Sequence, residues 1–423
     1  MLDIKFISEN SQKVKDACAV KKDNADIDRI VALDAERKSI LSNVEMLKHK
    51  RNEASAQVAA KKKSGEDASS IIEEMQGVSA KIKKLDEEVA AVIKERDEIV
   101  ARVPNIPHGS VPHGESEKDN VIYKEWGEKP NFDFEPKDHL ALAESLELFD
   151  FPRGAKIAGS GFPVLCGNGA RLNRALIDFF LDTHRKNGYK EIQPPYLVNA
   201  QSVFGTGQLP KTKEQMYYVG EDDLYAIPTA EVPVTNLYRD EYIDEKSLPI
   251  KLCAYSACFR REAGSYGKDT KGFLRVHQFD KVELVKFAHP DSSYEELESL
   301  RNDAENILQK LELPYRVLTL CDADLSFAAA KCFDLEVWAA GEKKWLEVSS
   351  CSNFESFQAT RMNIRFRRGG EKPQFVHTLN GSGLATARIL VAILENCQTE
   401  RGTVIVPKAL RPYMDGLEEI ASC

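Results

Sequence analysis

The sequence lacks the signals of secreted, membrane-spanning and zinc-stapled proteins. No basic segment followed by an apolar core opens the chain, and no window approaches the roughly 20 apolar residues that span a bilayer. The nine cysteines are odd in number and form no CxxC pair, and the eight histidines show no HExxH spacing. These absences argue against a disulfide framework and the common zinc motifs. We therefore expect reduced thiols, a cytoplasmic location and no membrane partner.

The chain also lacks an excess of positive charge and the familiar nucleotide-binding loops. Its 58 Lys and Arg against 67 Asp and Glu give a net charge of −9, which argues against a general polyanion binder. RNA contact through a local basic patch stays open. Neither a GxxxxGK[ST] loop nor a Rossmann fingerprint occurs. The 423 residues, 42% hydrophobic and 30% charged, are typical of a globular protein of about two or three domains.

An uninterrupted heptad pattern dominates the first hundred residues. Apolar positions recur at spacings of 3 and 4 in two stretches of similar length, separated by a short polar break around Gly65. Two seams of equal length can close on each other, so we expect an antiparallel helical hairpin. The seam positions are Ile30, Leu33, Arg37, Ile40, Val44, Leu47, Arg51, Ala54 and Val58, then Ile71, Met75, Val78, Ile82, Leu85, Val89, Val92, Arg96 and Ile99.

The two arms of this hairpin carry opposite charge. Residues 28–63 hold nine Lys/Arg and five Asp/Glu, a net of +4, and residues 66–102 hold six and ten, a net of −4. Charge pairing between the helices explains this pattern most simply. The alternative is a basic face, with Lys48, Lys50, Arg51 and residues 61–63, that follows a phosphate backbone.

A proline- and glycine-rich segment separates the hairpin from the rest of the chain. We expect an N-terminal helical domain over residues 1–103, a linker over 104–120 and a second domain over 121–423. In that domain the pattern predicts helices at 171–186, 292–311 and 384–397, with capping boxes available at Ser292/Glu295 and Ser293/Glu296. Strands are expected at 192–198 (interrupted by Pro194-Pro195), 251–261, 276–287, 315–320, 332–339 and 344–350. The fold class is therefore α+β, with a largely antiparallel sheet flanked by helices.

One predicted strand-loop-strand has side chains suited to a nucleotide. Arg260 and Glu262 are two residues apart, so on a strand they share a face. A guanidinium beside a carboxylate suits a polyphosphate with a neighbouring amino group. Phe279 and Glu283 share a face of the returning strand, and the loop between carries Lys268, Lys271 and Arg275. An ordinary surface hairpin is the alternative.

Two further segments suit a metal and an anion. Glu347 followed by Ser349 and Ser350 offers hard oxygen ligands for Mg²⁺. Strict alternation places Glu347 and Ser350 on opposite faces, so the strand must end or bulge there for both to reach one ion. Gly381-Ser382-Gly383 precedes a predicted helix that carries Arg388, and a helix N-terminus admits an anion. Taken singly, a solvent-facing edge strand explains the first segment more simply, and a tight turn or close helix packing explains the second.

Together these segments resemble a class II aminoacyl-tRNA synthetase. Residues 259–264, 267–272 and 275–279 resemble motif 2, residues 383–388 resemble motif 3, and the 171–186 helix with Pro194-Pro195 resembles motif 1. Residues 228–232, residues 347–353 and the helical arm narrow the resemblance to bacterial-type seryl-tRNA synthetases, over nearly the whole chain. Ala387 stands where other class II enzymes usually have Glu, so it receives no role.

The resemblance implies a role for each matching residue. Arg260, Glu347 and Arg388 would be catalytic, with Arg260 on the α-phosphate, Glu262 on the adenine amino group and Phe279 and Arg388 on the two faces of the ring. Glu283 would receive the amino group or the hydroxyl of serine. The implied ATP-binding residues are Arg260, Arg261, Glu262, Phe279, Glu347, Val348, Ser349, Ser350 and Arg388. The implied serine-binding residues are Thr229, Ala230, Glu231, Arg260, Glu283 and Ser382, and the implied Mg²⁺ ligands are Glu347 and Ser350.

The implied activity is ATP-dependent ligation of L-serine to tRNA(Ser) through a seryl-adenylate, in a homodimer. Selenocysteine tRNA is a further acceptor that the resemblance leaves open. Two alternatives remain: an amino-acid-activating ligase that acts on a carrier other than tRNA, and a non-catalytic coiled-coil scaffold. The complete heptad arm argues against the first, and the joint presence of Arg260, Glu262, Glu283, Glu347 and Arg388 argues against the second.

Overall fold

The computed structural model describes residues 1–262 and 272–422, and the chain divides into two compact units, residues 1–104 and 105–423. Lys268 and Lys271, which the sequence placed in the motif 2 loop, lie outside the described residues. Among the helices that are described, none is long and apolar enough to cross a membrane.

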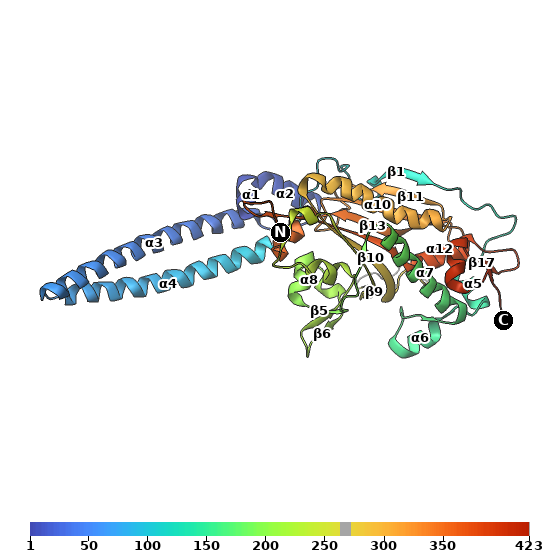
Figure 1. Ribbon diagram of the computed structural model, residues 1–423, viewed down its shortest axis with the longest axis horizontal. Helices are drawn as coiled ribbons and strands as arrows, with labels where there is room; N and C mark the ends of the chain where they lie inside the picture. Colours follow the sequence, from blue (N-terminus) through green and yellow to red (C-terminus); the bar gives the residue numbers. More distant parts are fainter. Residues whose placement is uncertain (263–271, 423) are drawn as a thin grey trace. The chain divides into compact units, whose positions relative to one another are not determined.

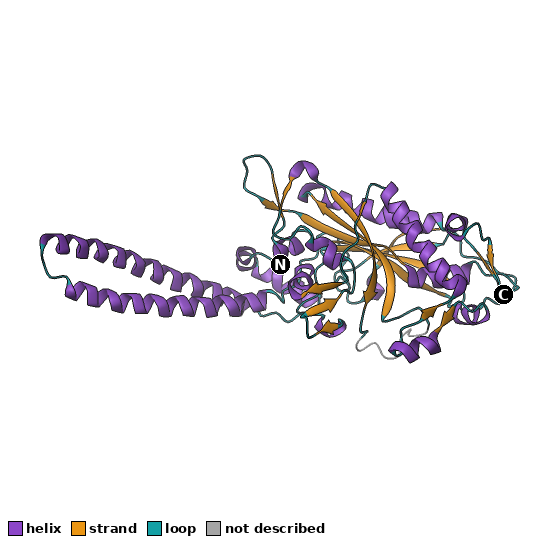
Figure 2. Cartoon of the chain, turned by 60° about the horizontal axis from the view of Figure 1, so that its bottom comes forward, coloured by secondary structure: helices purple, strands orange, loops and turns teal. Residues whose placement is uncertain are grey.

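The first unit is helical, with two short helices followed by a long hairpin (Figure 2). A left-handed Gly65, with a φ of 79°, ends the first long helix, where residues with a side chain are strained. At its start, the Asp26 carboxylate accepts a hydrogen bond from the backbone N–H of Arg29. The four helices are α1 (Ile4–Glu9), α2 (Ser11–Val20), α3 (Ile27–Ser64) and α4 (Ser69–Val100).

The predicted antiparallel coiled coil is confirmed. Seam residues from both arms are buried, among them Ile30, Leu33, Val44, Ala54 and Ile82. Ion pairs cross from the basic arm to the acidic one, which is the charge pairing that the opposite net charges predicted. These pairs are Arg29–Glu95 at 2.7 Å, Asp34–Arg96 at 3.2 Å, Lys48–Asp86 at 3.8 Å and Lys50–Glu74 at 2.6 Å.

The second unit is built around an eight-stranded sheet, whose strands β1, β11, β13, β10 and β9 are labelled in Figure 1. The sheet is antiparallel except at its edge, where the short strand β4 runs parallel to β9. Its strands, in spatial order, are β1 (Val121–Trp126), β11 (Tyr315–Thr319), β12 (Lys331–Ala339), β13 (Lys344–Asn353), β16 (His377–Ala385), β10 (Gln278–Ala288), β9 (Ile250–Phe259) and β4 (Lys190–Glu191). The predicted antiparallel sheet is therefore confirmed.

Three helices cover one face of the sheet and form the main core with it: α7 (Gly167–Lys186), α10 (Ser293–Lys310) and α12 (Thr386–Asn396). Leu284 of β10 points into this core. Its neighbour Glu283 points to the opposite face, where a cavity opens. A second core, including Val285 and Phe287, closes one end of that face beneath α9 (Glu231–Asn236) and α11 (Phe357–Met362).

Shorter elements complete the second unit. The helices are α5 (His139–Ser145), α6 (Phe151–Ala158) and α8 (Ala200–Thr206). The strands are β2 (Phe149–Asp150), β3 (Val164–Leu165), β5 (Leu197–Asn199), β6 (Tyr218–Val219), β7 (Leu224–Ala226), β8 (Tyr242–Asp244), β14 (Arg365–Arg367), β15 (Gln374–Phe375), β17 (Val404–Ile405) and β18 (Glu419–Ile420). Asn105, at the start of the expected linker, is buried in this unit, where its amide donates to the carbonyl oxygens of Ala328 and Phe354.

Three local predictions are wrong. The helix expected from residue 384 begins at Thr386, and Gly381-Ser382-Gly383 lies inside β16. Both glycines serve close packing, because a Cβ there would come within 2.9 Å of Cys351 or 2.6 Å of His184. The strand expected over 192–198 does not form: β4 ends at Glu191, and β5, which belongs to another sheet, begins at Leu197 after Pro194-Pro195. The N-cap of α10, Ser292, makes no side-chain capping bond, because its hydroxyl donates to the carbonyl oxygen of His289.

Candidate active site

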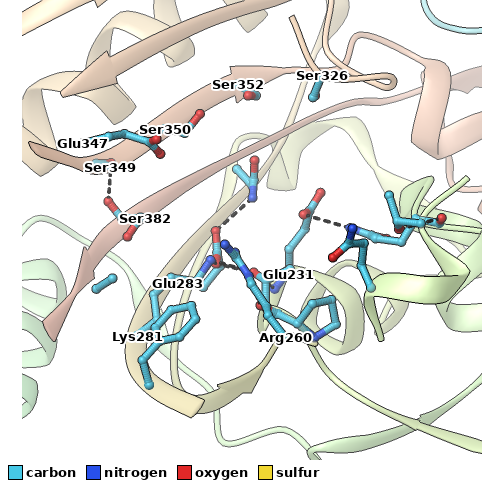
Figure 3. A pocket seen from close by; sticks show the side chains of 18 of the residues that line it. Glu231, Arg260, Lys281, Glu283, Ser326, Glu347, Ser349, Ser350, Ser352 and Ser382 are labelled. Carbon is cyan, nitrogen blue, oxygen red and sulfur yellow. Dashed lines mark hydrogen bonds and ion pairs between the residues drawn. The ribbon is translucent and has the colours of Figure 1, made fainter. Parts of the chain in front are cut away.

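Figure 3 shows part of the lining of a cavity of about 630 Å³ in the second unit. The cavity opens on the face of the sheet to which Glu283 points, away from the core formed with α7, α10 and α12. Strands β10, β13 and β16 form its floor, and the segment after β9 and the loops near residues 206–216 and 326–328 form its rim. Most of the predicted site residues line this cavity: Thr229, Glu231, Arg260, Glu262, Phe279, Glu283, Glu347, Val348, Ser349, Ser350, Ser382 and Arg388. Arg261 and Ala230 do not line it.

An acidic subsite is centred on Glu283 of β10. Its carboxylate forms a short ion pair with Lys281 and accepts hydrogen bonds from the Thr229 hydroxyl and, at 2.9 Å, from the Asn380 amide. Lys281 also donates to the Thr229 hydroxyl at 2.8 Å. Glu283 is only 1% exposed, and the ion pair and hydrogen bonds supply the partners that a buried carboxylate needs. The subsite therefore places a carboxylate directly beside an amino group.

A second buried carboxylate, Glu231, lies next to this subsite at the start of α9. It accepts hydrogen bonds from the amides of Gln358, at 2.6 Å, and Gln208, at 3.5 Å. In the described chain no lysine or arginine forms an ion pair with it. Burial, and then repulsion by Glu283, raise the pKa of Glu231 to about 7. A cationic ligand beside Glu231 would favour its charged form, because the cation would offset both burial and the repulsion by Glu283.

Arg260 and Phe279 form a cationic and aromatic wall of the cavity. The Arg260 guanidinium lies over the Phe279 ring, 5.1 Å from its centroid, and donates to the Pro228 carbonyl oxygen at 3.3 Å. Strand β9 ends at Phe259, so the expectation that Arg260 and Glu262 share a face of a strand is wrong. Glu262 has a φ of 48° and pairs with Arg275 at 3.1 Å. Both residues therefore reach the cavity from the irregular segment after β9, and strand alternation does not place them there.

Glu347 and Ser350 share a face of β13 because the strand contains a β-bulge at Val348. Ser349 pairs with Leu335 and Glu347 pairs with Glu336, so Val348 is an extra residue in the ladder. Val348 and Ser349 are therefore both buried, while Glu347 and Ser350 both face the cavity. Asp334, on the neighbouring strand β12, lies opposite Ser350 in the ladder. Burial, and then repulsion by the Glu347 carboxylate, raise the pKa of Asp334. Three acidic or hydroxyl side chains thus meet at one wall.

Arg388 closes this wall from α12. Its guanidinium donates to the Glu347 carbonyl oxygen at 2.6 Å and to the Leu274 carbonyl oxygen at 3.3 Å, and it lies 3.7 Å from the Glu347 carboxylate. Between the neighbouring strands β13 and β16, the Ser349 hydroxyl donates to the Ser382 carbonyl oxygen at 2.7 Å. The buried Ser382 hydroxyl has no hydrogen-bond partner among the residues that the structure describes. A buried polar group without a partner in a cavity indicates that a ligand supplies one.

Sequence reasoning missed several residues of the cavity and its support: Lys281, Asn380, Gln358 and Asp334. Two of them had a signal, because Lys281 lies at even spacing between Phe279 and Glu283, and Asn380 lies two residues before Ser382. Gln358 and Asp334 come from α11 and from the strand beside β13, and no local pattern connects them with the cavity.

The chain matches two family descriptions: "Seryl-tRNA synthetase N-terminal domain" over residues 1–107 and "tRNA synthetase class II core domain (G, H, P, S and T)" over residues 216–397. A serine--tRNA ligase from Chloroherpeton thalassium is 55% identical, over 98% of this chain and 99% of that protein. One from Nitratidesulfovibrio vulgaris is 53% identical over the full length of both.

Solved structures agree with these relatives. The seryl-tRNA synthetase from Pyrococcus horikoshii complexed with ATP is 39% identical, with a TM-score of 0.95 over 100% of both chains. The cytoplasmic serine-tRNA ligase from Naegleria fowleri in complex with AMP is 29% identical, with a TM-score of 0.90 over 100% of this chain and 99% of that one. The resemblance found in the sequence is thereby confirmed: the chain belongs to the seryl-tRNA synthetase family.

Proposed function

We propose that the cavity activates L-serine with ATP and transfers it to tRNA(Ser). One observation carries this proposal: the same cavity holds two carboxylates (Glu231, Glu283) and also two arginines and an aromatic ring (Arg260, Arg388, Phe279). The carboxylates suit the ammonium group of an amino acid. The arginines and the ring suit the phosphates and the base of a nucleotide. The relatives that span the full chain are named serine--tRNA ligases, which disfavours a carrier-protein ligase or a scaffold.

Serine fits the acidic subsite with its ammonium group on Glu231 and its hydroxyl near Glu283 and Ser382. Among the described residues, Glu231 forms no ion pair with a lysine or an arginine, whereas Glu283 pairs with Lys281. A bound ammonium group would favour the charged form of Glu231 and relieve its repulsion with Glu283. The Ser382 hydroxyl, which has no partner of its own among the described residues, is available to the substrate hydroxyl.

ATP fits the part of the cavity beside this subsite, with its adenine between Phe279 and Arg388 and its α-phosphate beside Arg260. The serine carboxylate attacks the α-phosphorus in line, the bond to the β-phosphate oxygen breaks, and pyrophosphate leaves. A ribose hydroxyl of the terminal tRNA adenosine then attacks the seryl carbonyl, and AMP leaves. Because no protein group needs to form a covalent bond, the site contributes mainly positioning and charge stabilisation by Arg260 and Arg388.

The wall formed by Glu347, Ser350 and Asp334 fits Mg²⁺, because it offers hard oxygen donors on one face of β12 and β13. Glu347 and Ser350 would hold the ion, which when bound would neutralise charge on the ATP phosphates. Glu347 would meanwhile hold Arg388 through their ion pair.

Replacing Glu347 by glutamine should raise the Mg²⁺ concentration that gives half-maximal pyrophosphate exchange. We expect an increase of about tenfold or more, as for other residues that support a bound metal. Glu135→Gln is the matched control, because this exposed carboxylate pairs with Lys343 at 2.9 Å and does not line the cavity. An unchanged Mg²⁺ requirement in the Glu347 variant would reject the assignment of this wall.

The helical arm is proposed to bind the tRNA body, and selenocysteine tRNA is proposed as a second acceptor. The arm matches the family's N-terminal domain, and Lys62 and Lys63 are exposed near its tip. The interhelical pairs neutralise much of the remaining basic charge, which leaves the tip as the main phosphate contact. We also propose a homodimer, which the motif 1 resemblance supports. We propose that it is cytoplasmic, which agrees with the reduced state of the eight described cysteines.

Shortening the arm should impair tRNA charging selectively. Replacing residues 38–90 with a short Gly/Ser turn keeps the base of the hairpin, including the Arg29–Glu95 pair. Serine-dependent pyrophosphate exchange should persist, whereas tRNA(Ser) affinity should fall by about tenfold or more. The slope of log K against log salt should flatten by about 0.7–0.9 for each phosphate that the arm no longer neutralises. We would measure pyrophosphate exchange, charging of both tRNAs and oligomeric state on the same variant. An equal loss of exchange and charging would contradict the proposal. A shift to monomer without a selective loss of tRNA affinity would contradict it as well.

A further inference from the structure

A chain of buried side chains lies behind Glu231. The Thr378 hydroxyl of β16 donates to the amide oxygen of Gln358 at 2.7 Å, and the Gln358 amide nitrogen donates to the Glu231 carboxylate at 2.6 Å. The same nitrogen donates to the Thr206 carbonyl oxygen at 3.1 Å. Thr378 is 0% exposed, Gln358 1% and Glu231 6%. Glu231 of helix α9 is 127 residues from Gln358 in the chain, yet this helix meets α11 and β16 behind the acidic subsite.

These contacts fix the orientation of the Gln358 amide. A carbonyl oxygen can only accept a hydrogen bond, so the nitrogen of the amide must face Thr206. The oxygen of the amide then faces Thr378, whose hydroxyl can donate to it. As a result, Glu231 receives an N–H donor from Gln358. A donor to a carboxylate favours its charged form, whereas burial favours the neutral form.

The effects that favour ionisation of Glu231 compete with effects that oppose it. Burial and the Glu283 carboxylate of β10 oppose its ionisation, and the Gln358 amide, the Lys281 ammonium of β10 and the Gln208 amide favour it. Arg260, after β9, is a further charged group in the same cavity. The resulting pKa of about 7 lies at the working pH of most enzymes. Loss of one donor is therefore enough to change how much of the carboxylate is charged.

We propose that Gln358, held by Thr378, is a positioning residue that keeps Glu231 charged and aimed into the cavity, and so sets the pH range over which serine binds. The inference rests on the proposed function, in which Glu231 receives the serine ammonium group. Gln358 acts through Glu231 and does not line the cavity itself.

Arg361, on the same helix, illustrates a structural role by contrast. Its guanidinium donates to the carbonyl oxygens of Phe204 and Leu209, at 3.1 Å each, and stacks against Phe204, Phe327 and Phe357. Helix α11 therefore holds the 204–209 segment through Arg361 and through the hydrogen bond from Gln358 to Thr206. Gln358 differs from Arg361 because it also donates to the Glu231 carboxylate. Changes that merely loosen this helix should lower stability without changing the pH dependence.

The test compares kcat/KM for serine in pyrophosphate exchange from pH 6 to pH 9, at saturating ATP, in the full-length enzyme. Gln358→Leu removes the donor at similar size, and Thr378→Val removes the hydroxyl that orients it. Loss of a donor raises the pKa of Glu231, so the acid limb should move to higher pH. A hydrogen bond to a charged group corresponds to a shift of about one pH unit. At pH 7 the KM for serine should therefore rise by up to about tenfold, with recovery towards pH 9 and little change in the KM for ATP.

Gln398→Leu is the matched control. Gln398 is also buried, and its amide donates to the carbonyl oxygens of Lys137 and Glu395, away from the cavity. This variant should lose stability without moving the acid limb. Thr378→Val is a smaller change and should move the acid limb of the pH profile in the same direction as Gln358→Leu. If Gln358→Leu does not fold, the profile of Thr378→Val tests the positioning role.

The outcomes separate this inference from the proposed function. A folded Gln358 or Thr378 variant with the wild-type acid limb would overturn the positioning role, even if its rate fell at every pH. Wild-type protein without serine-dependent exchange would instead overturn the proposed function. Calorimetry of serine binding at pH 6.5, in two buffers of different ionisation enthalpy, adds a readout without turnover. Serine should release a fraction of a proton from the wild-type protein, and a larger fraction from the Gln358 variant.

Discussion

Alanine should support pyrophosphate exchange roughly 10⁴–10⁵ times less efficiently than serine. A site that hydrogen-bonds a substrate hydroxyl rejects an analogue without it by about this factor, because buried polar groups are then left unpaired. The group at risk here is the Ser382 hydroxyl, which has no partner within the described chain, beside a Glu283 carboxylate that is almost completely buried. The measurement is kcat/KM for each amino acid at saturating ATP.

Two comparisons sharpen this prediction. Threonine keeps the hydroxyl and adds a methyl group, so crowding should exclude it less strongly than the missing hydrogen bond excludes alanine. Ser382→Ala should narrow the preference for serine over alanine by about tenfold, the size of one hydrogen bond. Equal exchange with serine and alanine in the wild-type protein would contradict the serine assignment of the acidic subsite.

Arg260→Ala should lower the rate of serine-dependent exchange by about 10²–10³, the usual effect of removing one preorganised donor. The Phe279 ring and the Pro228 carbonyl oxygen hold the guanidinium in place before ATP binds. The side chain lies at the cavity rim and is exposed, so its loss should leave the fold intact. Lysine should restore little activity, because a point charge cannot replace the planar fork.

The matched control for this variant is Arg401→Ala. Arg401 is an exposed arginine that pairs with Glu419 at 2.6 Å, away from the cavity. It tests whether loss of any surface guanidinium lowers the rate through net charge alone. Near-normal exchange by Arg260→Ala, with Arg401→Ala unaffected as well, would reject the role of Arg260 in adenylate formation.

The sequence predicted best where one period governs a long segment. The heptads of residues 30–99 determined both arms of the hairpin, because a helical seam repeats many times and one irregular position changes little. The central strands followed in the same way from their apolar composition. Predictions failed where a few residues decided the conformation. The glycines around Ser382 fit a turn as well as a strand, and their close contacts with Cys351 and His184 are tertiary.

The candidate site was predictable as a set of residues and much less as an arrangement. Alternation placed Phe279 and Glu283 together correctly, but it placed Arg260 and Glu262 on a strand that ends at Phe259. Gln358 reaches Glu231 from an element 127 residues away in the chain. Local sequence patterns carry no information about such contacts, because these depend on how α9, α11 and β16 pack.

The bulge at Val348 brings Glu347 and Ser350 closer together on one face of β13 than their separation in the sequence suggests. Three peptide units connect Glu347 to Ser350, yet these residues occupy neighbouring positions on one face, as residues two apart do in a regular strand. Val348 therefore matters as a spacer: its side chain can vary among residues that fit the core, but its deletion would turn either the carboxylate or the hydroxyl away from the cavity. Homologous chains should accordingly accept substitution at this position far more readily than a change in length.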